Sequence, residues 1–136
     1  GMFGDRLATS LAERGVVGLV IDSGCRDVAT LRKMQFPVWS RAVSARGTVK
    51  ATLGAVNIPV VCAGALVRPG DVVVADEDGV VVVPHADTGS AVTATRQRIE
   101  REELNRKRLA TGELGLDIYD MRETLARAGL VYVDHE

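Results

Sequence analysis

The sequence predicts an α/β fold in a single domain over residues 1–136, and three observations carry this prediction. A chain of 136 residues suits one compact domain better than two. A continuous apolar run at residues 16–21 lies between two segments of helical periodicity, which is the β-loop-α pattern of a parallel sheet. Aromatic residues are only 4% of the chain, so the core must be aliphatic, and the valine-rich runs indicate strands.

The first predicted element is a helix over residues 5–14. Leu7, Leu11 and the neighbouring alanines recur at three-to-four spacing, and Gly15 ends the helix. The apolar run that follows is the predicted buried strand.

A polar connection at residues 22–27 leads from that strand to a second helix. The helix is predicted over residues 27–34, with Asp27 at its N-cap. A short strand over residues 36–39 follows. The Gly- and Ala-rich stretch of residues 41–55 has no periodicity that assigns it.

The second half of the chain predicts further strands and two helices. Residues 58–62 are a strand candidate, and Asp76-Glu-Asp-Gly79 separates two valine runs in the manner of a hairpin turn. A long polar helix is predicted over residues 87–109, and a shorter one over residues 117–128.

Charge and composition exclude several classes of protein. The net charge is −1, from 17 basic and 18 acidic residues, so nothing favours nucleic acid or an anionic membrane as a partner. Neither a membrane-spanning stretch nor an export signal is evident, and a cytoplasmic protein is the default expectation. Two cysteines and two histidines are too few for a disulfide framework or a histidine-rich metal cluster.

One group of polar residues stands where the predicted elements meet. Asp5 begins the first helix, and Arg26 and Asp27 lie between the buried strand and the second helix. Ligands gather at the carboxyl ends of strands in such sheets, and a helix start favours an anion. From the spacing alone, however, two ordinary helix caps and a solvated arginine explain this pattern better than a site does.

A resemblance changes that balance. GDRLATS at residues 4–10, followed by VIDSGCRD at residues 20–27, resembles the 4-hydroxy-4-methyl-2-oxoglutarate / 4-carboxy-4-hydroxy-2-oxoadipate aldolases. These are divalent-metal pyruvate aldolases of the ribonuclease E activity regulator-like superfamily. Their signature of Asp, twenty residues and then Arg-Asp stands here as Asp5, Arg26 and Asp27. The similarity continues through FPVWSRAVSARGTVKATLGAVNIPVVCAG, VRPGDVVVADEDGVVVVP and LATGELGLDIYDMRETLARAGLVYVD, and so covers essentially the whole chain.

The resemblance implies a role for each residue near the signature. Asp27 would bind Mg²⁺ or Mn²⁺ directly, and Asp5 would hold a metal-bound water that is also the preferred candidate for the general base. Arg26 would contact the pyruvyl keto oxygen and stabilise the enolate. The backbone amides of Arg6 and Leu7 would bind the pyruvyl carboxylate. A metal and a guanidinium suit the negative charge that develops on this oxygen.

The resemblance also implies an assembly and a fold. Glu102, by itself a typical solvated helix charge, aligns with a glutamate that reaches the metal waters of a neighbouring subunit in a homo-trimer or hexamer. The implied fold is a layered sandwich of the ribonuclease-regulator-like, swivelling β/β/α-like type. The chain corresponds to the C-terminal part of the family's domain, and we expect it to expose apolar surface that the N-terminal part covers in relatives.

Two functions follow as expectations. The first is a lyase that releases pyruvate from a branched hydroxy-oxo acid, with accompanying oxaloacetate decarboxylation, in protocatechuate and gallate breakdown. The three lysines lie in polar surroundings, which favours a metal-dependent over a Schiff-base mechanism. The alternative is a non-catalytic protein that binds and inhibits ribonuclease E.

Overall fold

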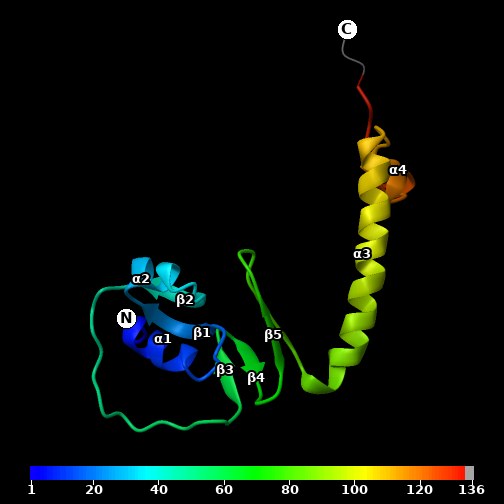
Figure 1. Ribbon diagram of the computed structural model, residues 1–136. Coiled ribbons are helices and arrows are strands. Elements are labelled where there is room, and N and C mark those ends of the chain that lie inside the picture. Colours follow the sequence, from blue (N-terminus) through cyan, green and yellow to red (C-terminus); the bar gives the residue numbers. More distant parts are fainter. Residues whose placement is uncertain (134–136) are drawn as a thin grey trace. The chain divides into compact units, whose positions relative to one another are not determined.

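The structure is a computed structural model that describes residues 1–133. Contacts divide the chain into two compact units, residues 1–88 and residues 89–136. Helices and strands alternate over residues 5–43 of the first unit and further strands follow them, which confirms the predicted α/β class (Figure 1). The extent of a single domain over residues 1–136 stays a prediction.

A parallel pair of strands organises the first unit. Strand β1 (Leu19–Cys25) pairs with β2 (Val38–Val43), with Leu19 opposite Val38 and a register shift between Ile21 and Gly24. The predicted parallel arrangement is therefore confirmed. Strand β1 begins and ends later than predicted, because the polar residues assigned to a connection pair through their backbone instead.

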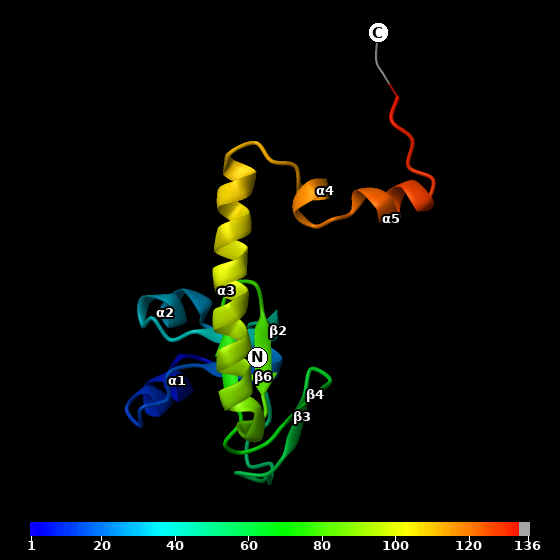
Figure 2. The same cartoon turned by 90° about the vertical axis from the view of Figure 1, so that its right-hand side faces the viewer.

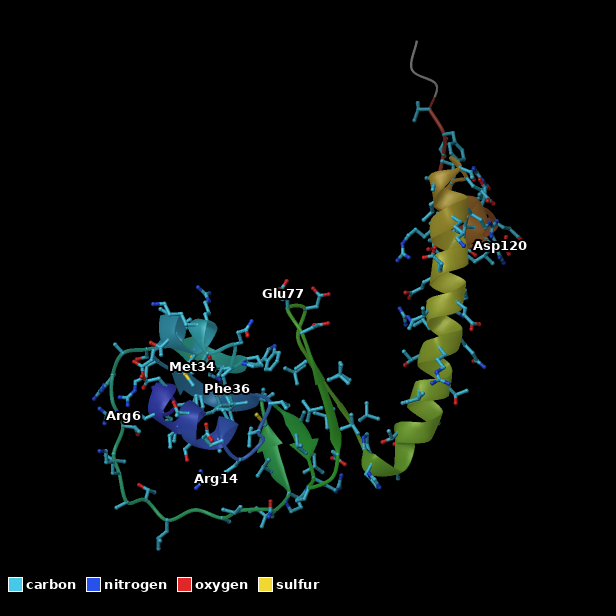
Figure 3. The ribbon with its side chains drawn as sticks, in the orientation of Figure 1. Arg6, Arg14, Met34, Phe36, Glu77 and Asp120 are labelled. Carbon is cyan, nitrogen blue, oxygen red and sulfur yellow. The ribbon has the colours of Figure 1, made fainter. Side chains whose placement is uncertain are left out.

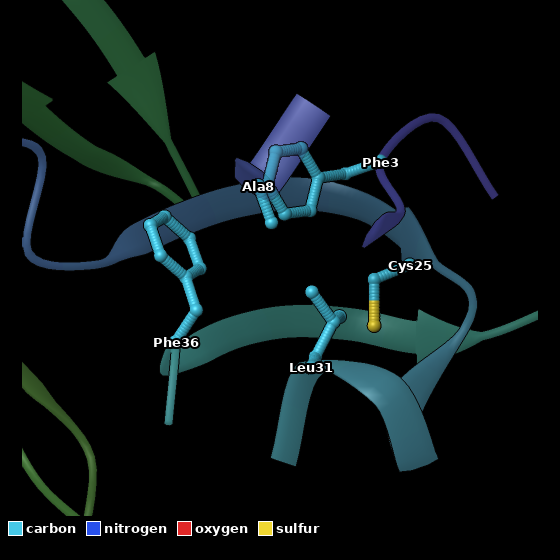
Figure 4. Packing of buried hydrophobic residues seen from close by; sticks show 5 residues of the cluster. All are labelled: Phe3, Ala8, Cys25, Leu31 and Phe36. Atoms are coloured by element: carbon cyan, nitrogen blue, oxygen red, sulfur yellow. The ribbon is translucent and has the colours of Figure 1, made fainter. Parts of the chain in front are cut away.

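Two short helices complete the core of this unit. Helices α1 (Asp5–Ala12) and α2 (Val28–Lys33) contact each other beside the strand pair. Figure 4 shows the buried side chains of this cluster gathered next to β1, and they are Phe3, Ala8, Cys25, Leu31 and Phe36. The rings of Phe3 and Phe36 stack with their centroids 6.0 Å apart. The core is small, and every other apolar side chain packed against it is only partly buried.

Two antiparallel hairpins follow residues 44–59, which form no helix or strand. Strand β3 (Val60–Cys62) pairs with β4 (Ala65–Val67), and β5 (Val72–Ala75) pairs with β6 (Val80–Val83). The predicted hairpin turn is confirmed: the Asp76 carboxylate accepts the amides of Asp78 and Gly79 at 2.8 and 3.2 Å.

Side-chain hydrogen bonds join the hairpins to the strand pair. Trp39 Nε1 donates to the Asp76 carbonyl at 2.7 Å. The Asp22 carboxylate accepts the Ala63 amide at 3.2 Å and pairs with Arg41 at 2.8 Å. Asp22 therefore has a structural role that its place in a predicted loop did not indicate.

The end of the first unit and the second unit are helical (Figure 2). A 3₁₀ turn, η1 (His85–Asp87), leads into α3 (Thr88–Ala110), close to the predicted bounds. The helix predicted over residues 117–128 is wrong as one element, because α4 (Gly115–Ile118) and α5 (Arg122–Arg127) are separate. Asp120 between them has a positive φ of 51°, which a continuous helix does not allow. Among residues 1–133, no helix is both long and apolar enough to cross a membrane.

Candidate functional site

The carboxyl end of β1 lies beside the start of α1. The Met2 amide donates to the Gly24 carbonyl at 2.8 Å, and the Arg26 amide donates to the Phe3 carbonyl at 2.9 Å. These bonds add the first residues of the chain to the edge of β1. They place the start of α1 beside the loop that follows β1, as expected for a shared site at the carboxyl end of the strand.

Asp27 has an unusual backbone conformation and an unexpected partner. It occupies the N-cap position of α2, but its φ of 59° and ψ of 32° are left-handed, and its side chain makes no capping bond there. The predicted N-cap position of Asp27 is confirmed, but its side chain does not cap α2, because side-chain capping needs an extended N-cap residue. The carboxylate instead accepts the amide of Asp5, with Oδ2 3.3 Å from the nitrogen. Asp27 therefore caps α1, the helix that is distant in sequence.

Arg26 and Gly4 surround the same carboxylate. Arg26 Nε lies 3.4 Å from Asp27 Oδ2, and the two side chains are 43% and 37% exposed. A Cβ placed on Gly4 would lie 2.4 Å from Asp27 Oδ2 and 2.9 Å from Arg26 Cγ and Nε. Only glycine therefore permits this approach. The importance of Gly4 was not predicted, although its place directly before Asp5 is a signal that could have indicated it.

Four of the predicted residues share one open pocket of about 580 Å³. The pocket is lined by Asp5, Arg6, Arg26, Asp27, Val43 and Ala45. Val43 and Ala45, from the end of β2 and the segment after it, were not predicted. They belong to the stretch that has no periodicity, so only the fold could reveal them.

The start of α1 offers unused hydrogen-bond donors to this region. The first helical bond runs from the Ala8 amide to the Gly4 carbonyl at 3.1 Å. Asp27 accepts the Asp5 amide, whereas the amides of Arg6 and Leu7 donate to nothing within the described part of the chain. The Leu7 side chain is exposed and does not line the pocket, so only its amide is a candidate for binding.

The pocket supplies two hard oxygen donors for a cation. Among residues 1–133 no group of three or more acidic, histidine or cysteine side chains is placed to hold a metal ion. Magnesium, however, keeps several waters and is commonly held by only one or two carboxylates. Asp5 and Asp27, both lining the pocket, therefore fit Mg²⁺ or Mn²⁺ in number and in chemistry.

Glu102 belongs to α3 in the second unit. Its carboxylate pairs with Arg98 Nε at 2.6 Å, and its side chain is half exposed. Its predicted contact with a neighbouring subunit stays a prediction. Cys25 and Phe36 are both buried in the core of the first unit.

Comparison with known proteins places the chain among its relatives. The model of the family described as RraA-like: Aldolase/RraA matches residues 1–82. A protein of Halalkalibacterium halodurans is 27% identical over 105 residues, covering 77% of this chain and 50% of the relative. One of Stutzerimonas stutzeri is 37% identical over 83 residues, covering 61% and 51%. Both are provisionally named 4-hydroxy-4-methyl-2-oxoglutarate aldolases. The chain spans about half the length of these curated relatives.

Solved structures agree with this placement. An uncharacterized protein from Pseudomonas syringae pv. tomato superposes with a TM-score of 0.74 at 27% identity, covering 87% of this chain and 60% of that one. RraAS2 of Streptomyces coelicolor, titled an unusual member of the RNase ES inhibitor RraA protein family, gives 0.72 at 34% identity, covering 79% and 56%. The predicted ribonuclease-regulator-like fold and the resemblance are thereby confirmed. The chain belongs to the RraA-like, Aldolase/RraA family.

Proposed function

We propose that this protein acts as a divalent-metal-dependent aldolase in aromatic catabolism. The substrate would be 4-hydroxy-4-methyl-2-oxoglutarate or 4-carboxy-4-hydroxy-2-oxoadipate, cleaved to pyruvate plus pyruvate or oxaloacetate. The observation that carries the proposal is the convergence of Asp5, Arg26 and Asp27 on one pocket at the start of α1. The names of the relatives from Halalkalibacterium and Stutzerimonas support the same reaction class.

The pocket has a separate group for each polar part of the pyruvyl moiety. The unused amides of Arg6 and Leu7 would bind its carboxylate, which the positive end of α1 favours. Asp27 would hold a Mg²⁺ or Mn²⁺ ion directly and Asp5 would hold it through water. When bound, the ion supplies a Lewis acid for the keto oxygen.

The residues of the chain then account for the movement of charge. As the bond between C3 and C4 breaks, its electron pair forms the C2–C3 double bond of the pyruvate enolate, and negative charge collects on the C2 oxygen. The guanidinium of Arg26 stabilises this oxygen. Asp5 positions the water that accepts the C4 hydroxyl proton as the new carbonyl forms. A proton added at C3 completes pyruvate.

The same enolate accounts for oxaloacetate decarboxylation. Loss of CO₂ from oxaloacetate leaves the electron pair on the same pyruvate skeleton, so Arg26 would stabilise both transition states. Lys33, Lys50 and Lys107 do not line the pocket, which supports chemistry without a lysine imine.

Pyruvate release tests the proposal. The chain is incubated with 4-hydroxy-4-methyl-2-oxoglutarate and Mg²⁺, with and without a chelator, beside Asp27→Asn and the matched control Asp78→Asn. Asparagine tolerates the left-handed backbone of Asp27, so the substitution removes the charge and preserves the loop. We expect metal-dependent release that Asp27→Asn abolishes and Asp78→Asn preserves. Chelator-resistant release, or an active Asp27→Asn protein, would contradict the proposal.

Ribonuclease E inhibition is the second candidate function. The likeness to RraAS2 at 34% identity supports it. The direct measurement is cleavage of a ribonuclease E substrate with increasing amounts of the chain. Inhibition that persists in Asp27→Asn, together with no pyruvate release by the unmodified chain, would favour this function over the aldolase.

A further inference from the structure

Arg6 is the cation of the pocket that the proposed reaction does not use. It is the second residue of α1 and lines the pocket beside Arg26. Within residues 1–133 its exposed guanidinium has no ion pair or hydrogen bond. Arg14 lies beyond the other end of the same helix, as the labelled side chains of Figure 3 show. It donates instead to Ser10, with Nη1 2.7 Å from the carbonyl oxygen and 2.8 Å from the hydroxyl.

The charges of the pocket indicate what Arg6 is available to bind. Asp5 and Asp27 contribute two negative charges, and Arg6 and Arg26 contribute two positive charges. A divalent cation held by the two carboxylates would offset their charge and leave both guanidiniums uncompensated. The pocket would then attract an anion that carries more than one negative charge.

The proposed function gives a role to every other polar group that lines the pocket. The helix amides bind the pyruvyl carboxylate, and Arg26 binds the keto oxygen. The substrates of the proposed reaction carry a further carboxylate on the far side of the bond that breaks. A guanidinium is the side chain best suited to a carboxylate, because its parallel N–H groups match the two oxygens.

We propose that the Arg6 side chain binds this remote carboxylate and selects oxo acids with a second carboxylate over monocarboxylic ones. The inference rests on the proposed function, because it takes the orientation of the pyruvyl group from it. Arg6 thus has two separate parts in recognition. Its amide binds one carboxylate, and its side chain binds the other.

Two inert five-carbon acids test this selectivity without turnover. 2-Oxoglutarate has the second carboxylate, whereas 2-oxopentanoate has a methyl group in the same position, and neither carries the hydroxyl that retro-aldol cleavage requires. Their dissociation constants are measured by calorimetry in the presence of Mg²⁺ for the unmodified chain, Arg6→Gln, Arg6→Lys and Arg14→Gln. Arg14→Gln removes the same charge beyond the other end of α1, at a residue that does not line the pocket.

We expect the unmodified chain to prefer 2-oxoglutarate. Arg6→Gln should weaken the binding of 2-oxoglutarate by about tenfold and change the dissociation constant of 2-oxopentanoate by less than about twofold. Arg6→Lys should retain part of the preference, and Arg14→Gln should retain all of it. An equal loss for both acids, or no loss for either, would overturn the role of Arg6.

The outcomes also distinguish a failure of this inference about Arg6 from a failure of the proposed aldolase function. Pyruvate release from the hydroxy-oxo acid together with an unchanged preference in Arg6→Gln would contradict the inference and leave the aldolase standing. Failure of the unmodified chain both to bind either acid and to release pyruvate would overturn the proposed function and the inference together.

Discussion

The Asp27 carboxylate accepts the first amide of α1 and lies within 3.4 Å of Arg26 Nε. One side chain thereby joins residues that are more than twenty positions apart. Its left-handed backbone is a conformation that aspartate tolerates better than most residues, and such positions often occur at binding sites. The backbone conformation of Asp27 therefore places its negative charge beside the start of α1 and Arg26.

Arg26 is the residue whose loss we expect to affect catalysis most. In Arg26→Ala, kcat for pyruvate release should fall by about 10²–10³, as for other donors to a developing oxyanion, with a smaller change in KM. Steady-state kinetics with 4-hydroxy-4-methyl-2-oxoglutarate measures both. Arg41→Ala, which removes a guanidinium outside this pocket, is the control. A near-normal kcat in Arg26→Ala would remove Arg26 from the mechanism.

Gly4 provides a steric test of the same site. In Gly4→Ala the new Cβ would lie 2.4 Å from Asp27 Oδ2, so Asp27 and Arg26 must move. Both side chains are partly exposed and can move aside, so the unfolding free energy should change little, whereas displacement of the reacting groups should lower turnover by about a hundredfold. Urea unfolding and pyruvate release measure the two effects. Gly54→Ala, where no atom lies within 4 Å, should change neither.

At the scale of the elements, the Asp71 carboxylate links the residues before β5 to those after β6 through hydrogen bonds. The Arg68 and His85 amides donate to its carboxylate at 2.8 and 3.0 Å and hold its pKa below its usual range. A carboxyl whose pKa is lowered by folding stabilises the folded state above its ordinary pKa. That contribution is lost as the pH falls through the lowered value.

Asp71→Asn tests this contribution. The substitution should lower the melting temperature at pH 7, and the difference from the unmodified chain should shrink as the pH falls below about 4, the usual value for aspartate. Trp39, the single tryptophan, donates to Asp76 in the same hairpin, so its fluorescence can follow the melting. Asp78→Asn serves as the control. A difference in melting temperature that does not change with pH would show that the charge of Asp71 does not stabilise the folded state.

At the scale of the whole molecule, the first unit has more apolar surface than its small core can cover. Val61, Val74 and Val81, all on the hairpins, are 70%, 57% and 61% exposed. Apolar side chains that are exposed to this degree on strands favour association. The expectation that the chain exposes apolar surface is confirmed.

We predict that the chain assembles through these hairpins. Sedimentation velocity should give a mass three or six times 14.5 kDa, as expected for a homo-trimer or hexamer. Charged residues in Val61→Lys/Val81→Lys should shift the assembly toward the monomer, because they would have to be buried in the contact. Leu53→Lys, at a 99% exposed position outside the hairpins, should not. A monomeric unmodified chain would contradict the prediction.

The sequence by itself was enough for the local elements and for the residues of the signature. The spacing of Leu7 and Leu11 predicted α1, and the valine runs around Asp76 predicted the second hairpin, because both depend on neighbours along the chain. The order of Asp5, Arg26 and Asp27 also marked the candidate site. Errors arose at residues 22–25 and 119–121, where backbone pairing and a left-handed residue override the pattern of side chains.

Only the tertiary structure decided how these residues meet. Three features depend on contacts between residues distant in sequence. They are the hydrogen bond that the Asp5 amide donates to Asp27, the need for glycine at position 4, and the lining of the pocket by Val43 and Ala45. Hydrophobic periodicity does not predict such contacts. It indicates which face of a helix or strand is buried, but not which residues of another element pack against that face. The position of Arg6 beside Arg26 is of this kind, since it follows from the first residues of the chain pairing along β1.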